Sequence, residues 1–180
     1  SIYTGAMPSA DRDRLFAKYF ADMQEVVEFG CGAGENLLAL PGKRQRGYDW
    51  SAQAVARCRA KGIETEVLDM RHPSAVPLAG CGVFTVHALE QLGEDWHPML
   101  YLLRSSHPKV VVHIEPVYEL YDPLDLNDFL AMKYHEARGY LSGFLPGLRD
   151  WSAFVDILEV TKSPFGNINH KAYSVIAWRP

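Results

Sequence analysis

The sequence predicts an α/β fold: a seven-stranded, mostly parallel sheet with an antiparallel C-terminal hairpin and helices on both faces. Three observations predict it. β-rich runs alternate with helical runs up to residue 114, which is typical of right-handed crossovers in a parallel sheet. The run 109–114 contains three consecutive valines, as a fully buried central strand does. The last two β-rich runs lie too close together for a parallel return, so they must pair antiparallel.

The first two thirds of the chain carry the alternating elements. Apolar residues at helical spacing, preceded by Ser9 as a cap, predict a helix over 9–23. Ser51 caps an alanine-rich helix that stops at Gly62. The other predicted helices are 35–40 and 96–106, and the predicted strands are 26–29, 47–49, 63–68, 82–87 and 109–114.

The last third departs from this alternation. Residues 124–138 have a helical pattern, and 139–148 form an aromatic, glycine-containing segment that ends in a turn. Strands over 154–161 and 172–178 follow. The stretch 116–152 is too long for a simple connection. Because the length suits one domain, we interpret 1–180 as a single domain and 116–152 as a lid or substrate-binding insertion within it.

Composition narrows the functional classes. Lys and Arg number 18 against 22 Asp and Glu, a net charge of −4, so the basic field of a nucleic-acid binder is missing. Three cysteines without a CxxC pair predict neither a zinc site nor a disulfide framework. The sequence has neither an apolar run of the roughly 20 residues that span a bilayer nor a visible signal peptide. We expect a cytoplasmic protein that contacts no membrane; the oligomeric state is not predicted.

The most specific motif follows the first predicted strand: Val26-Val27-Glu28-Phe29-Gly30-Cys31-Gly32-Ala33-Gly34. Glycines at alternate positions let the backbone approach a ligand closely, and the next helix directs its free N–H groups at an anion. A dinucleotide fingerprint would need GxGxxG. Its third glycine would fall at Glu35 or Leu37, so that interpretation fails at its defining residue.

This ExGxGxG pattern resembles motif I of the class I S-adenosylmethionine-dependent methyltransferases, and the resemblance extends over nearly the whole chain. It implies a Rossmann-like fold and S-adenosylmethionine as cofactor. It also implies that Asp49 holds the ribose hydroxyls, that Trp50 lies against the adenine, and that Asp69 and Met70 read the adenine edge. The segment 85–91 is similar to the one beneath the methionine arm. The implied cofactor-binding residues are Glu28, Gly30, Gly32, Gly34, Asp49, Trp50, Asp69, Met70 and His87.

Methyl transfer requires positioning and, for a hydroxyl acceptor, a base. Candidate bases lie at the ends of the fourth and fifth strands: His87, His113 and Glu115. His113 is equally well explained as a buried, hydrogen-bonded core residue. A metal site formed by His113 and Glu115 lacks the Asp-rich pattern of metal-dependent members, and we predict no metal.

The aromatic residues of the insertion suit the wall of an acceptor pocket or, equally, the core of a lid. The candidate substrate-binding residues are Tyr118, Tyr140, Phe144 and Trp151. We predict O-methyl transfer to a small natural-product or sugar-like hydroxyl. Two alternatives stay open: a protein or RNA methyltransferase that works with a partner subunit, and a non-catalytic S-adenosylmethionine-binding protein.

Overall fold

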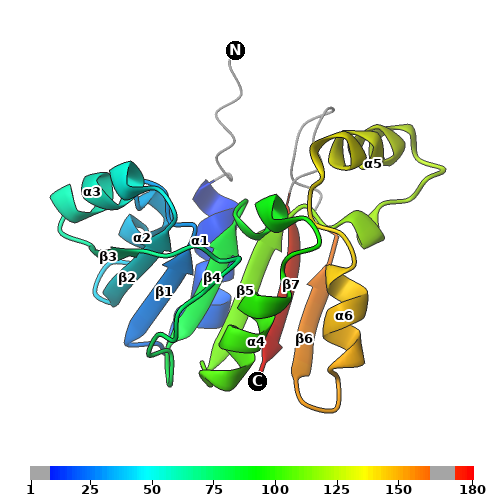
Figure 1. The fold of residues 1–180 in the computed structure, drawn as a ribbon. Helices are drawn as coiled ribbons and strands as arrows, with labels where there is room; N and C mark the ends of the chain where they lie inside the picture. The colour runs from blue at the N-terminus through cyan, green and yellow to red at the C-terminus, as the bar shows by residue number, and fades with distance from the viewer. Residues whose placement is uncertain (1–8, 163–172) are drawn as a thin grey trace.

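A computed structural model describes residues 9–162 and 173–180. They form a seven-stranded sheet with the strand order β3-β2-β1-β4-β5-β7-β6 (Figure 1). The strands are β1 (Glu25–Phe29), β2 (Arg44–Asp49), β3 (Glu64–Val67), β4 (Gly82–Val86), β5 (Val110–Glu115), β6 (Asp156–Thr161) and β7 (Ser174–Arg179). The helices are α1 (Ser9–Phe20), α2 (Glu35–Leu38), α3 (Ala52–Ala60), α4 (His97–Ser105), α5 (Leu126–Arg138) and α6 (Phe144–Asp150), with 3-10 turns η1 (Leu89–Leu92) and η2 (Tyr118–Leu120).

The sheet is parallel from β3 through β5 and antiparallel at β7 and β6. β7 lies between β5 and β6 and pairs antiparallel with both. The predicted antiparallel pairing at the C-terminus is therefore confirmed, although its connection, 163–172, lies outside the described residues. Because β1 to β5 are parallel, their C-terminal ends share one edge, where ligands bind in open α/β sheets.

Helices cover both faces of the sheet, as predicted (Figure 1). Side chains of α1, α2 and α3, such as Phe20, Leu37 and Cys58, pack in the core of one face. Residues of α4 and α6, such as Met99 and Leu148, pack in the core of the other. Every residue of β5 is buried, which confirms its predicted central place. No described helix has the length and apolar character needed to cross a bilayer.

The helix α6 is the main departure from the predicted elements, because 139–148 was expected to end in a turn. Pro146 lies in the first turn of α6, where a helix tolerates proline because the missing N–H would have no partner. A Cβ on Gly147 would lie 2.1 Å from the Trp96 ring, so this glycine lets the helix pack closely on that ring. Tertiary packing therefore outweighs the local turn preference.

The other differences concern the ends of helices and strands; β2, for example, begins at Arg44 rather than at 47. α1 ends at Phe20 rather than near 23, and α2 ends at Leu38 rather than near 40. Ser9 is the first residue of α1. Ser51 caps α3 as predicted, since its hydroxyl accepts the Ala54 N–H at 3.3 Å.

Candidate functional site

The glycine turn after β1 is held against the end of β2. The N–H groups of Gly30 and Cys31 both donate to the Tyr48 carbonyl, at 2.7 and 3.1 Å. Gly30 has φ +72°, and a Cβ there would lie 2.2 Å from the Cβ of Ala88. Only glycine fits at this position, because a side chain would be both strained and obstructed. The backbone of the turn therefore lies directly against the segment that follows β4.

Asp49, at the end of β2, connects the same turn to the start of α3. Its Oδ2 accepts the Gly32 N–H at 2.8 Å, and its Oδ1 accepts the Ser51 N–H at 2.9 Å. The residue is buried, with 8% of its surface exposed. A carboxylate has about four lone-pair positions, so this one is held rigidly and can still accept hydrogen bonds from ligand hydroxyl groups.

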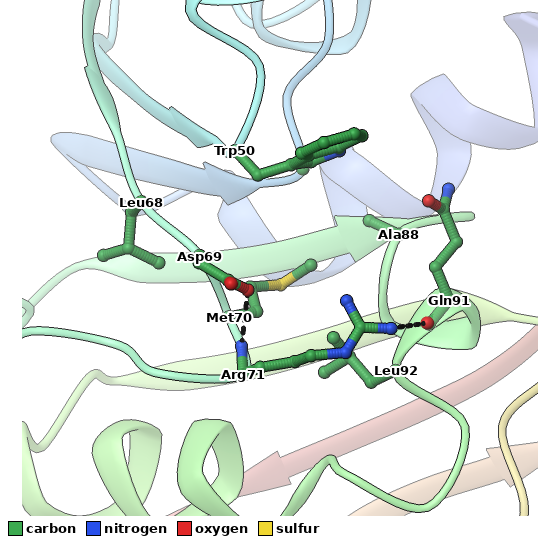
Figure 2. A pocket seen from close by; sticks show the side chains of 9 residues that line it. Trp50, Leu68, Asp69, Met70, Arg71, Ala88, Gln91 and Leu92 are labelled. Atoms are coloured by element: carbon green, nitrogen blue, oxygen red, sulfur yellow. Dashed lines mark hydrogen bonds between the residues drawn. The ribbon is translucent and has the colours of Figure 1, made fainter.

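A cavity of about 150 Å³ opens at this edge of the sheet (Figure 2). Four predicted cofactor-binding residues line it: Gly30, Trp50, Asp69 and Met70. Its other lining residues, which the sequence analysis did not select, are Leu68, Arg71, Ala88, Gln91 and Leu92. The strand ends thus bring together residues from the glycine turn, from the ends of β2 and β3, and from η1.

Trp50 and Arg71 lie on opposite sides of this cavity (Figure 2). The Trp50 ring is 73% exposed, so a flat ligand group would find an uncovered aromatic face. The backbone N–H of Arg71 donates to Asp69 Oδ1 at 2.9 Å. The side-chain Nη2 of Arg71 donates to the Gln91 carbonyl at 2.6 Å. Arg71 therefore ties the end of β3 to η1. Its only sequence signal was its position two residues after Asp69.

Five predicted cofactor residues do not line the cavity: Glu28, Gly32, Gly34, Asp49 and His87. Gly32 contributes its N–H to Asp49, and Gly34 caps α2 while packing against Cys58. Glu28 is fully buried, and its Oε1 accepts a hydrogen bond from the Asn36 side chain at 2.8 Å. Burial raises the pKa of Glu28 to about 8. Glu28, Gly32 and Gly34 therefore support the glycine turn without lining the cavity.

Glu115 and His113, two of the candidate bases, are both completely enclosed. Glu115 Oε1 accepts the N–H groups of Ala88 and Leu89 at 3.1 and 3.0 Å, and Oε2 accepts that of Glu90 at 3.2 Å. His113 Nδ1 lies 3.0 Å from Thr85 Oγ1, and its ring packs against Phe144 and Trp178. Burial lowers the pKa of His113 to about 3, which keeps it neutral.

His87 lies in a different setting, just beyond the end of β4. Its backbone has φ +51°, a left-handed conformation that is uncommon for a non-glycine residue and concentrates at functional sites. Nδ1 lies 3.4 Å from Oε1 of the buried Glu90. Burial opposes the charged imidazolium, but the hydrogen bond and charge of Glu90 outweigh it and raise the pKa of His87. His87 immediately precedes Ala88, which lines the cavity.

A second cavity, of about 340 Å³, lies beyond η1 and brings together the predicted Tyr118 and Tyr140. Two carboxylate residues, Glu94 and Glu136, also line it. Phe144 and Trp151 do not line it: Phe144 is buried against Trp96 and His113, and Trp151 packs on the core formed with α4 and α6. The four aromatic residues proposed for the acceptor are thus divided between a cavity and the core.

Within the described ranges, no three His, Cys, Asp or Glu side chains are grouped as a metal ion would require. The three cysteines are buried free thiols. Burial raises the pKa of Cys31, and likewise that of Cys58 and Cys81, which disfavours the reactive thiolate.

Comparisons with known proteins give matches to solved structures only; no family model and no curated protein matches the chain. The chain is similar to magnesium protoporphyrin IX methyltransferase from Synechocystis PCC 6803 (TM-score 0.68, 16% identity, covering 95% of this chain and 82% of that one). It is also similar to the N-methyltransferase NodS from Bradyrhizobium japonicum WM9 (TM-score 0.70, 14% identity, 94% and 85% covered). A third is geranyl diphosphate C-methyltransferase from Streptomyces coelicolor A3(2) (TM-score 0.64, 12% identity, 94% and 80% covered).

The chain has the class I methyltransferase fold. All three similar proteins were solved with S-adenosylhomocysteine bound. In this chain, the glycine turn, an exposed indole and a carboxylate after β3 line one cavity, and Asp49, the residue before the indole, holds the glycine turn. That combination suits a ligand with vicinal hydroxyls and a flat heterocycle, as an adenosine moiety has.

Proposed function

We propose that this chain is an S-adenosylmethionine-dependent methyltransferase that acts on a small molecule. The observation that carries the proposal is the cavity lined by Gly30, Trp50 and Asp69 at the C-terminal edge of the sheet, with the Asp49 carboxylate beside it. The fold that the chain shares with methyltransferases supports it.

Each part of the cavity has a role in this proposal. Asp49 accepts hydrogen bonds from the ribose hydroxyls, Trp50 covers the adenine, and Asp69 and Met70 contact its edge. When bound, S-adenosylmethionine supplies a methyl group on a positively charged sulfur. The protein then positions the acceptor in line with the methyl–sulfur bond and excludes water.

We further propose a hydroxyl acceptor, with His87 as the base. An imidazole oriented by a carboxylate is suited to take a proton, and Glu90 lies in position to orient it. His113 and Glu115 are less suited, because they are 1% and 0% exposed, whereas the His87 side chain is 20% exposed although its Nε2 is enclosed. Transfer to a hydroxyl then leaves the methyl on oxygen, the proton on His87 and the bond electrons on sulfur.

The cavity between η1 and α5 is the proposed acceptor site. Tyr118 and Tyr140 offer aromatic faces, while Glu94 and Glu136 offer carboxylate oxygens that accept hydrogen bonds from hydroxyl groups. The Tyr118 hydroxyl already donates to Glu136 at 2.8 Å. Aromatic faces beside carboxylates suit a sugar-like or polyhydroxylated natural product. Gln91 and Leu92 of η1 line the cofactor cavity, and the next two residues, Gly93 and Glu94, line this one.

Calorimetric titration with S-adenosylhomocysteine, and separately with NADH, tests the cofactor. We expect binding of the first ligand alone, weakened at least about tenfold in Asp49→Ala because charged hydrogen bonds to the ribose are lost. Asp156→Ala, an exposed carboxylate in β6, is the matched control and should bind normally. Absence of S-adenosylhomocysteine binding by the unmodified protein would refute the proposal.

Turnover tests the base. A panel of phenols, sugars and amines is incubated with S-adenosylmethionine, and S-adenosylhomocysteine formation is followed. We expect transfer to a hydroxyl compound, lost in His87→Gln while cofactor binding persists. Transfer to an amine that survives this substitution would contradict both the hydroxyl acceptor and the role of His87.

One observation favours a second candidate, a protein or RNA methyltransferase that works with a partner subunit. Large apolar side chains are exposed on α5 and just before its start: Leu124, Leu126, Phe129 and Leu130. Large apolar side chains exposed close together along the chain can mark an interaction site. Turnover of a free small molecule by the isolated chain would argue against this candidate.

A further inference from the structure

The segment 87–92 forms one wall of the cofactor cavity, and a single buried side chain holds its start. Glu115, at the end of β5, lies with its carboxylate against three consecutive backbone N–H groups, those of residues 88, 89 and 90. Leu89 is the first residue of η1, so two of the three N–H groups belong to the first turn of that 3-10 helix. Both carboxylate oxygens are engaged, and the residue has no exposed surface.

This arrangement differs from what a general base requires. A base must come within hydrogen-bond reach of the proton that it removes. Glu115 is separated from solvent by the very backbone that it binds. Its contacts act on the shape of the cavity instead.

The position of the wall matters because it contacts the glycine turn and the end of β3. Ala88 lies so close to Gly30 that a Cβ on the glycine would stand 2.2 Å from the Cβ of Ala88. Farther along the same segment, Leu92 lines the cavity. The Gln91 carbonyl accepts a hydrogen bond from Arg71 Nη2 at 2.6 Å. A shift of this segment would therefore change the cavity on two sides.

We propose that Glu115 is a positioning residue: through three backbone hydrogen bonds it fixes the segment 88–90 and so keeps the cofactor cavity in its binding shape. The inference rests on the proposed function in one respect, that S-adenosylhomocysteine is the ligand used to probe the cavity. Glu115 acts without touching the ligand.

The same segment continues to the acceptor side. The Glu90 carbonyl accepts the Leu141 N–H at 2.9 Å, and the Gly93 carbonyl accepts that of Ser142 at 3.3 Å. The residues held by Glu115 are thus bonded directly to the chain beside Tyr140. Fixing residues 88–90 consequently also positions the chain next to Ser142, which lines the second cavity.

The test compares Glu115→Gln with Glu119→Gln. Gln at 115 has nearly the same side-chain volume as Glu, but its NH₂ group replaces one of the two accepting oxygens. At that position a hydrogen bond is lost, and two N–H donors face each other. Glu119 is the matched control, because its carboxylate accepts the backbone N–H of Gly143, the cap of α6, and none of the N–H groups of residues 88–90. Binding of S-adenosylhomocysteine is measured by calorimetry, thermal unfolding by circular dichroism, and amide exchange by mass spectrometry.

We expect Glu115→Gln to bind S-adenosylhomocysteine about tenfold more weakly, as the loss of a charged hydrogen bond implies. Its faster amide exchange should be confined to peptides that contain residues 88–90. Glu119→Gln should bind normally. Equal affinity of Glu115→Gln and the unmodified protein would overturn the inference, as would faster exchange spread across β5 and β7, which indicates general loosening.

The rate of amide exchange in the unmodified protein tests the inference even where the variant fails to fold. The inference requires that amides 88–90 exchange slowly without ligand, and rapid exchange there overturns it. Failure of the unmodified protein to bind S-adenosylhomocysteine would instead refute the proposed function, and the exchange result would still judge the role of Glu115.

Discussion

The two ends of the ligand-binding edge are built in different ways. On the cofactor side, the lining residues lie within six residues of the C-terminal ends of β1, β2, β3 and β4, and these adjacent parallel strands bring them to one edge. On the acceptor side, the residues belong to η2, α5 and the chain before α6, which no strand register aligns. A site formed by strand ends follows from order along the chain, whereas a site formed by an insertion depends on how the insertion packs.

The aromatic residues of the insertion show this difference most clearly, and Phe144→Ala would have the largest effect. Phe144 is 1% exposed and packs edge-on against Trp96 and His113, with ring centroids 5.5 and 5.1 Å apart. We expect a loss of about 3–5 kcal/mol in the free energy of unfolding, measured by urea denaturation. Phe154→Ala, which is 61% exposed, should cost far less. Equal losses would contradict the division between core and cavity.

Gly30→Ala should have the next largest effect, on the cofactor side. The new methyl group would overlap the Ala88 side chain and impose φ +72° on a residue with a Cβ. Overpacking of this kind costs about 1–3 kcal/mol, and we expect it to appear as roughly tenfold to hundredfold weaker binding of S-adenosylhomocysteine. Gly42→Ala is the control, since its φ is +78° but nothing lies within 4 Å. Unaltered binding of S-adenosylhomocysteine by Gly30→Ala would show that Ala88 can shift to accommodate the new methyl group.

Much of the fold and of the cofactor cavity could be predicted because periodicity and strand ends are local signals. The alternation of elements and the buried run in β5 follow from order along the chain, and the resemblance to motif I indicated Gly30, Trp50, Asp69 and Met70, which line one cavity. Arg71 could not be predicted, because its hydrogen bond to the Gln91 carbonyl joins segments 20 residues apart.

The surroundings of the candidate bases and the packing of the insertion could not be predicted from local signals. A strand end indicates where a side chain begins but not what encloses it, and neither Glu115 nor His113 has a surface open to a substrate. In the insertion, α6 was missed because its packing against Trp96 is a tertiary effect. Composition did indicate an aromatic segment, yet only packing separates Tyr118 and Tyr140 from Phe144.

Tyr140→Ala would sharpen the comparison from the acceptor side. Tyr140 is partly exposed and lines the cavity, so its removal should affect the acceptor rather than the fold. We expect KM for a hydroxyl acceptor from the panel to rise about tenfold, within the range of an aromatic contact and its buried area. Binding of S-adenosylhomocysteine should not change. A loss of stability comparable to that of Phe144→Ala would instead place Tyr140 in the core.

Glu28→Gln should have the smallest effect near pH 5, and this effect should grow as pH rises. Burial raises the pKa of Glu28 to about 8 from an ordinary value of 4.5, so the fold favours the protonated carboxyl. The stability that this provides is fully present below about pH 4.5 and is lost as pH rises through about 8. Gln is neutral throughout and keeps an oxygen for the Asn36 donor.

The melting temperature of Glu28→Gln should therefore match that of the unmodified protein near pH 5 and exceed it by a few degrees at pH 8. Thermal unfolding at the two pH values, with and without S-adenosylhomocysteine, measures this difference. An advantage that does not vary with pH would contradict the burial argument. If the variant is stabilised yet binds the cofactor normally, Glu28 supports the glycine turn without contacting the ligand. If it is stabilised but binds weakly, the cofactor side contains a carboxylate whose charge lowers the stability of the fold while strengthening ligand binding.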